Sequence, residues 1–124
     1  MSKKYILAFD QGTTSSRTLL LDQHLRMIGM EQIELPQYYP ERGWVEQNPE
    51  EIWSTQLESA NNLLTHIPDA AGNIITAGIT NQRETTIVWN KRTGKPIYNA
   101  IVWQCRRTAE ICEKIKSQGW EEYI

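Results

Sequence analysis

The chain opens with two apolar segments separated by a small polar turn. Tyr5-Ile-Leu-Ala-Phe9 is continuously apolar and ends at Asp10, and Arg17-Thr-Leu-Leu-Leu21 follows after a few polar residues. Apolar runs of this length are typical of buried strands, and so short a separation predicts an antiparallel hairpin. A third strand is predicted from Met27 to Leu35, although one glutamate interrupts its alternating pattern.

The next element is an amphipathic helix with a clear start. Asn48-Pro49-Glu50-Glu51 combines a capping side chain, a proline suited to the first helical position and a glutamate placed for reciprocal capping. We expect the helix to end before Pro68. Apolar side chains recur in it at helical spacing, at Ile52, Trp53, Leu57, Ala60, Leu63 and Leu64. The preceding loop carries three aromatic residues that we expect to pack over an edge of the core, namely Tyr38, Tyr39 and Trp44.

The last third of the chain predicts three more strands and a second helix. The strands are expected at residues 74–80, 86–89 and 97–103. Residues 107–117 are predicted to be helical, with Arg106 and Arg107 at a solvated start and Gly119 as a stop signal. The resulting order, β-β-β-α-β-β-β-α, predicts a mixed sheet with flanking helices, an α/β fold.

The composition of the chain argues against several classes of function. The chain has 124 residues, of which 40% are hydrophobic and 23% are charged, which is ordinary for one globular domain. A formal net charge of −2 argues against nucleic-acid binding. The apolar runs are too short for membrane insertion or a signal peptide. Cys105 and Cys112 match neither a metal nor a disulfide pattern, which favours a reduced, cytoplasmic compartment.

The segment from Asp10 to Arg17 carries the clearest chemistry. Asp10 ends a buried strand, where a carboxylate is costly unless it is paired, hydrated or near a metal. Gly12 lets the main chain bend and approach an anion, and successive N–H groups of such a turn can form an anion-binding concavity. Arg17 adds a positively charged guanidinium group, whose fixed set of N–H donors is suited to phosphate. A phosphate loop with a carboxylate for hydrated Mg²⁺ explains these features, and a polar hairpin turn with a structural aspartate explains them nearly as well.

A second polar segment, Asn81-Gln-Arg-Glu84, joins two apolar stretches. A charged pair held at the edge of a cleft can hydrogen-bond vicinal hydroxyl groups, with Arg83 donating and Glu84 accepting. A solvated turn is the alternative. Trp103 ends a predicted strand, where its indole could either pack on the carbon side of a small polyol or belong to the core.

Four segments together resemble the FGGY carbohydrate kinases, and within them the branch that phosphorylates glycerol. They are Asp10–Arg17, Gly43–Pro49, Gly78–Trp89 and Gly94–Gln104, and the resemblance runs from about Tyr5 to Ile124. The first segment is also similar to the first phosphate motif of the wider superfamily of sugar kinases, Hsp70 and actin. The resemblance implies an actin-like, ribonuclease H-like ATPase fold.

By this resemblance, each matching residue acquires an expected role. Asp10 is expected to lie near Mg²⁺, holding it through water, and Arg17 to reach the nucleotide phosphates. Three further residues are expected to line the phosphate site, namely Thr13, Thr14 and Ser15. Arg83 and Glu84 are expected to bind glycerol hydroxyl groups, and Trp103 to pack against the glycerol carbons. ATP and Mg²⁺ are the implied cofactors, glycerol is the implied acceptor, and the full-length protein is expected to be a homo-oligomer.

The resemblance also implies that residues 1–124 are the N-terminal part of the first of two domains. The general base, the second phosphate loop and the adenine pocket are then expected beyond Ile124, and the isolated piece is expected to lack activity. Two other functions stay open: a kinase for another polyol or a ketose, and a non-catalytic actin-like nucleotide-binding module.

Overall fold

A four-stranded sheet forms the body of the molecule. The computed structural model describes residues 2–123, and its main strands are β1 (Tyr5–Gln11), β2 (Ser15–Asp22), β3 (Met27–Glu34) and β5 (Ile74–Thr80). Their order is β3-β2-β1-β5, with β1 antiparallel to β2, β2 antiparallel to β3, and β5 parallel to β1. The predicted hairpin and third strand are therefore confirmed.

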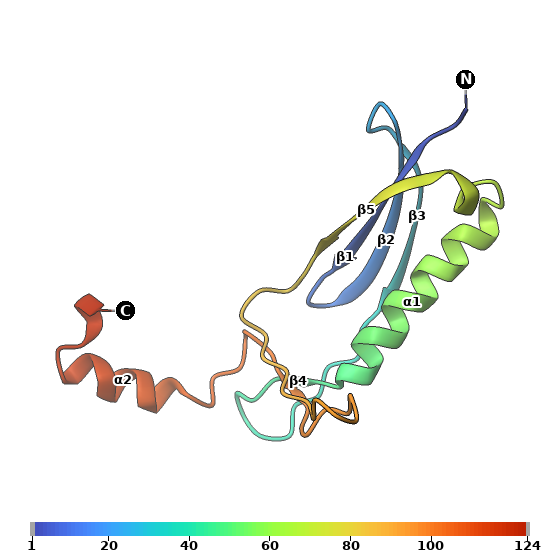
Figure 1. Ribbon diagram of the computed structural model, residues 1–124. Helices are drawn as coiled ribbons and strands as arrows, with labels where there is room; N and C mark the ends of the chain where they lie inside the picture. The colour runs from blue at the N-terminus through green and yellow to red at the C-terminus, as the bar shows by residue number, and fades with distance from the viewer. Residues whose placement is uncertain (1, 124) are drawn as a thin grey trace.

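Helix α1 (Pro49–His66) covers one face of this sheet and packs against β2 and β3 (Figure 1). Asn48 caps it as predicted, because its side-chain oxygen accepts the main-chain N–H of Glu50 at 3.0 Å. Glu51 does not complete the expected reciprocal cap and instead accepts the hydroxyl proton of Tyr38. The buried hydrophobic cluster lies between α1 and the sheet and consists of Tyr5, Leu7, Leu20, Leu63 and Ala70.

The apolar stripe predicted for α1 is confirmed at Ala60 and Leu63, which are buried, whereas nearer the start of the helix the face turned to β2 is polar. A hydrogen bond of 2.8 Å joins the hydroxyl groups of Ser16 and Thr55, and one of 2.7 Å joins those of Thr18 and Ser59. Trp53 is 62% exposed, so it does not serve as a core residue of this sheet. Small hydroxyl side chains allow the helix to lie close to the strand, and the hydroxyl groups of these two pairs satisfy each other. The buried Oε1 of Gln56 on the same helix face has no hydrogen-bond partner within the described residues.

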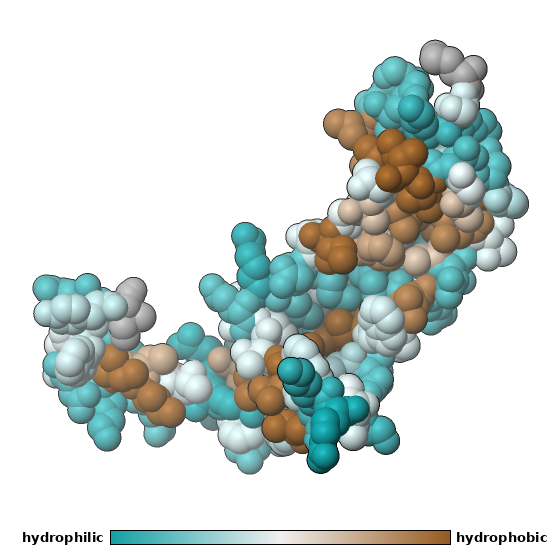
Figure 2. Space-filling view, in the orientation of Figure 1, coloured by the Kyte–Doolittle hydropathy of each residue, from teal (hydrophilic) through white to brown (hydrophobic). Residues whose placement is uncertain are grey.

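The sheet face opposite α1 is open. Strand β5 forms one edge of the sheet, and its Ile75 and Ile79 are 61% and 80% exposed. Figure 2 shows apolar surface gathered over this part of the molecule, where β5 faces the viewer in Figure 1.

After β5 the chain forms an irregular lobe beside the N-terminal end of α1. Its only ladder in the described part joins β4 (Glu46–Gln47) to β6 (Ala100–Ile101) in antiparallel fashion. The strands expected at 86–89 and 97–103 are wrong apart from these two residues of β6. Isolated bridges replace them, between Thr86 and Ile101 and between Trp89 and Pro96. Around the second bridge, the Ile97 N–H donates to the Val88 carbonyl at 3.0 Å and the Asn90 N–H to the Lys95 carbonyl at 2.8 Å.

Helix α2 (Ala109–Ser117) starts two residues later than predicted and projects from the body of the molecule (Figure 1). None of its residues is buried, so the expected face of Ile111, Cys112 and Ile115 is not covered in the described residues. Gly119 follows with a φ of +78° and ends the helix as predicted. Short 3₁₀ turns occupy Ala71–Asn73 and Glu121–Tyr123. Among residues 2–123, we find no helix long and apolar enough to cross a bilayer.

Candidate functional site

A cavity of about 500 Å³ lies where β1 and β5 end side by side. Because the two strands run parallel, the last residue of β5, Thr80, pairs with Asp10 of β1. The segment after β5 therefore emerges directly beside the turn between β1 and β2. The cavity is lined by residues 10–13, residues 81–84 and Trp103, so it unites the two polar segments that the sequence singled out.

The turn between β1 and β2 is short and tightly held. The Gly12 N–H donates to the Ser15 carbonyl at 2.9 Å, and the Leu35 N–H donates to the Thr14 carbonyl at 2.9 Å. A methyl group on Gly12 would lie 3.1 Å from the Ser15 carbonyl oxygen. Glycine is therefore favoured here by the lack of space for a side chain and not by a positive φ. Thr13 lines the cavity, whereas Thr14 is exposed and does not line it.

Ser15 differs from the other residues expected at the phosphate site. It is the first residue of β2, is 8% exposed and does not line the cavity. Its main-chain carbonyl holds the turn by accepting the Gly12 N–H. The structure thus brings Thr13 to the cavity and leaves Thr14 and Ser15 beside it.

Asp10 and Arg17 face each other across the β1–β2 ladder and form an ion pair. Alternate residues of a strand point to opposite faces, so Arg17 lies on the face opposite Ser16 and Thr18, which contact α1. The Arg17 side chain remains 43% exposed, and its buried Nε has no hydrogen-bond partner in the described residues. The pair therefore places a cation and a carboxylate together at the base of the turn.

Arg83 and Glu84 lie at the rim of the cavity with unengaged side chains. Both are exposed, and no hydrogen bond or ion pair joins either side chain to another group within residues 2–123. Glu84 has a φ of +66°, a left-handed conformation that is costly for a residue other than glycine. Strained backbone of this kind occurs preferentially at ligand sites. An unengaged donor and an unengaged acceptor are suited to a ligand with adjacent hydroxyl groups.

Trp103 contacts both sides of the cavity, because its main chain is held by Thr85 and its side chain reaches the turn between β1 and β2. Its indole Nε1–H donates to Thr13 Oγ1 at 2.9 Å, and the side chain stays about half exposed to the cavity. The ring is therefore fixed at one edge while its face is accessible. The core alternative that the sequence left open for Trp103 is wrong.

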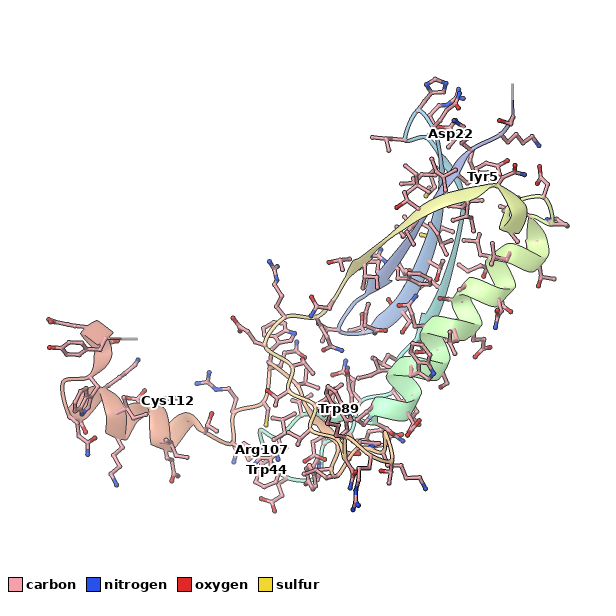
Figure 3. All side chains as sticks on the ribbon, viewed as in Figure 1. Tyr5, Asp22, Trp44, Trp89, Arg107 and Cys112 are labelled. Atoms are coloured by element: carbon pink, nitrogen blue, oxygen red, sulfur yellow. The ribbon has the colours of Figure 1, made fainter. Side chains whose placement is uncertain are left out.

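A buried carboxylate anchors the lobe that carries Trp103. Glu46 is 3% exposed and accepts hydrogen bonds from Arg107, Tyr98 and Asn99 at 2.7–2.9 Å. Burial alone would raise the pKa of Glu46, but these three donors outweigh it and lower that pKa. The Arg107 guanidinium also lies over the Trp44 ring, 3.8 Å from its centre. Figure 3 labels the two residues next to each other.

The expectation of a solvated helix start at Arg107 is therefore wrong, because the side chain is only 14% exposed. Of the loop aromatics, Trp44 is half-buried against Arg107, whereas Tyr38 and Tyr39 are exposed, at 41% and 69%. The prediction that all three pack over the core edge fails for the two tyrosines.

The cavity suits a metal ion that arrives with a phosphate ligand. No cluster of three or more His, Cys, Asp or Glu side chains exists among the described residues, so a metal cage made by the protein alone is absent there. Mg²⁺ typically uses one or two carboxylates, several waters and substrate phosphate oxygens. Asp10, one carboxylate facing the cavity, fits that requirement.

Three residues that hold the site together were not foreseen as functional. Gln47 links β4 to the turn, Gln82 links the polar segment to Gln47, and Thr85 links Gln82 to Trp103. The Gln47–Thr13 and Gln47–Gln82 contacts join residues 34 and 35 positions apart, whereas Gln82 and Thr85 are only three positions apart. The polar character of Gln82 between two apolar stretches was the one sequence signal that could have identified them.

Comparison with known proteins assigns this architecture to a family. Residues 5–124 match the N-terminal domain of the FGGY family of carbohydrate kinases. The chain is 59% identical over 122 residues to glycerol kinases of Alkaliphilus metalliredigens and of Pasteurella multocida. Each alignment covers 98% of this chain and 24% of the relative, so the chain spans about a quarter of their length.

Solved structures agree on the fold. A glycerol kinase of Plasmodium falciparum crystallised with ADP superposes with a TM-score of 0.83 and 32% identity, over 93% of this chain and 23% of that one. A xylulose kinase of Lactobacillus acidophilus reaches a TM-score of 0.85 at 21% identity, over 97% of this chain and 24% of that one, and so bears on fold alone. The expected actin-like, ribonuclease H-like fold is confirmed as a partial domain.

Proposed function

The chain belongs to the FGGY family of carbohydrate kinases, and from this we propose that it is the N-terminal part of an ATP-dependent glycerol kinase. The reaction is transfer of the terminal phosphoryl group of ATP to a primary hydroxyl of glycerol, giving sn-glycerol 3-phosphate. Residues 1–124 form part of the first of two domains in this proposal. The identity of 59% to glycerol kinases supports the choice of acceptor within the family.

One observation carries the proposal: a single cavity contains both a phosphate-type turn and an unengaged hydroxyl-binding pair. Arg83 donates to glycerol oxygens and Glu84 accepts from their hydroxyl groups. The accessible face of Trp103 packs against the carbon backbone of the acceptor. Glycerol has oxygen on every carbon along one edge and C–H groups along the other, so a cavity that offers both polar groups and an aromatic face suits it.

The phosphate side of the cavity is assigned to the β1–β2 turn. Main-chain N–H groups and the hydroxyl groups of Thr13, Thr14 and Ser15 cradle phosphate oxygens, and Arg17 contributes positive charge. Asp10 would hold Mg²⁺ through water, and the ion would supply positive charge to balance the transferred phosphoryl group. Thr14 and Ser15 lie beside the cavity in this structure, so their contribution requires the nucleotide to extend past Thr13 along the turn.

Catalysis in this proposal consists of positioning and electrostatic stabilisation. Asp10 is engaged with Arg17, which makes it unsuited to take the proton of the attacking hydroxyl. We therefore assign the general base to sequence beyond Ile124. A homo-oligomeric assembly in the cytoplasm, with glycerol and ATP as substrates, belongs to the same proposal.

The test is steady-state kinetics of the full-length protein with two matched substitutions. Glu84→Gln removes the charged acceptor, and Glu58→Gln makes the same change on an exposed residue of α1 outside the cavity. Loss of a hydrogen bond to a charged group costs about 1.5–3 kcal/mol, so we expect the glycerol KM to rise about 10- to 100-fold in Glu84→Gln alone. An unchanged glycerol KM in that variant would contradict the assignment.

A further inference from the structure

Five residues around the cavity are connected by a closed ring of hydrogen bonds. Gln47 Nε2 donates to the Thr13 carbonyl at 2.6 Å, and Gln82 Nε2 donates to Gln47 Oε1 at 2.7 Å. The Thr85 hydroxyl donates to Gln82 Oε1 at 2.9 Å and accepts the main-chain N–H of Trp103 at 3.3 Å. The Trp103 indole closes the ring by donating to Thr13 Oγ1 at 2.9 Å.

The donor and acceptor of every hydrogen bond from Gln47 to Trp103 are determined by two main-chain groups, the Thr13 carbonyl and the Trp103 N–H. The Thr13 carbonyl can only accept, so Gln47 presents its NH₂ group there and its oxygen to Gln82. Gln82 must then donate through its own NH₂ group, which leaves its oxygen for the Thr85 hydroxyl proton. The main-chain N–H of Trp103 can only donate, which agrees with a Thr85 oxygen that has already used its proton. The two amides therefore act as one-way connectors that no carboxylate or apolar side chain reproduces.

Burial makes this ring rigid. Gln47 is 0% exposed, so its amide cannot exchange a lost partner for water. Gln82 is half-buried and directly precedes Arg83 and Glu84. An unsatisfied buried donor or acceptor costs about 1–3 kcal/mol, which keeps the neighbouring residues in the one arrangement that satisfies all of them.

We propose that Gln82 is a positioning residue that sets the acceptor-binding groups relative to the phosphate turn. Gln82 lines the cavity, but both ends of its amide are used within the ring, so it is assigned no contact with either substrate in this proposal, which rests on the proposed function. Gln82 links Gln47, which is anchored on the phosphate turn, to Thr85, which holds the main chain of Trp103. Its loss frees the 81–84 segment from Gln47 and leaves the Thr85 hydroxyl, which holds the main chain of Trp103, without its acceptor. Thr13 keeps its bonds to Gln47 and to the indole. The acceptor side of the cavity therefore loosens and the phosphate side does not.

The experiment is a double-mutant cycle in the full-length protein, with the KM values for glycerol and for ATP measured separately. The variants are Gln82→Met, Thr85→Val and their combination. Gln32→Met is the matched control, because Gln32 is exposed on β3 and its side chain has no hydrogen bond within the described residues. Melting temperatures of all variants show whether folding is preserved.

We expect the glycerol KM to rise about tenfold in Gln82→Met and in Thr85→Val, with the ATP KM changed less than about twofold. Because both substitutions interrupt the same connection, the double variant should resemble either single variant and not show a hundredfold product. The control should match the wild type. A purely structural role would lower the melting temperature and the amount of active protein without this separation of the two KM values.

Each alternative outcome identifies what fails. Equal increases in both KM values, multiplicative effects in the double variant, or a glycerol KM in Gln82→Met equal to that of the control would overturn the positioning role while leaving the proposed function intact. Wild-type protein that does not phosphorylate glycerol would overturn the proposed function first. If Gln82→Met does not fold, Thr85→Val alone still decides, because an unchanged glycerol KM in that variant refutes the connection.

Discussion

The carboxylate of Glu46 offers a direct test of how the lobe around Trp103 is held. In the Glu46→Ala variant, three donors lose their acceptor at once: Tyr98 Oη, Asn99 Nδ2 and Arg107 Nη2, which lie 2.7–2.9 Å from the carboxylate oxygens. The Arg107 guanidinium is then left with its charge largely buried. We expect the folded state to be strongly destabilised.

The size of the effect follows from these contacts. Removing one partner of a buried ion pair costs about 3–5 kcal/mol. Arg107 keeps its stacking contact with Trp44 at 3.8 Å, and a cation–π contact of this kind offsets about 0.5–2 kcal/mol. We therefore expect a loss of about 3 kcal/mol for Glu46→Ala. Glu46→Gln keeps the shape and one acceptor oxygen, so a loss of about 1–2 kcal/mol is expected.

The assay is chemical denaturation of the full-length protein, followed by the fluorescence of its tryptophans, across a range of pH. The pKa of Glu46 is lowered in the folded state, so its contribution is present above the ordinary carboxyl pKa and is lost as the pH falls through the lowered value. Glu46→Gln should therefore flatten the acid side of the stability profile. A Glu46→Ala variant as stable as the wild type at neutral pH would refute the anchoring role.

Three other substitutions test separate parts of the account. Gly29→Val should lower the free energy of unfolding by about 1–3 kcal/mol in denaturant titrations. The reason is that a Cβ atom at this position would lie 2.8 Å from Ile67 Cδ1 and 2.9 Å from Leu63 Cδ1. An unchanged denaturation midpoint would contradict this packing. Glu84→Gly should leave the melting temperature unchanged or raise the stability by up to about 1 kcal/mol, while the glycerol KM rises, because glycine removes the strain of the left-handed φ. A large loss of stability would show that Glu84 has a structural role instead. Arg17→Gln should raise the KM for ATP about tenfold or more in steady-state assays and leave the glycerol KM nearly unchanged, and the opposite pattern would move Arg17 to the acceptor side.

The parts of the fold that depend on local sequence could be predicted. The β1–β2 hairpin follows from two apolar runs around a short polar turn, and the start of α1 follows from the capping residue Asn48. Asp10 and Arg17 could be assigned to one site because they are seven positions apart in a hairpin that pairs them directly. These features need only contacts between residues close in the chain.

The parts that depend on distant contacts could not be predicted. The Glu46–Arg107 pair spans 61 residues and the Gln47–Gln82 bond spans 35, and nothing in the local sequence indicates which polar side chains meet. Arg107 was expected at a solvated helix start because its local context is that of a helix terminus, whereas a distant carboxylate and Trp44 bury it. The strands expected between residues 86 and 103 were predicted from apolar content alone, which cannot show that a partner strand is lacking.

The most direct measurement is a coupled assay of the full-length protein with ATP and Mg²⁺, using glycerol and then a panel of other polyols and ketoses. We predict a clear preference for glycerol, with the preference lost in the Glu84→Gln variant. Activity with another acceptor would keep the kinase assignment and contradict the acceptor site built from Arg83, Glu84 and Trp103. Nucleotide binding without phosphorylation of any acceptor would contradict the central claim and indicate a non-catalytic module.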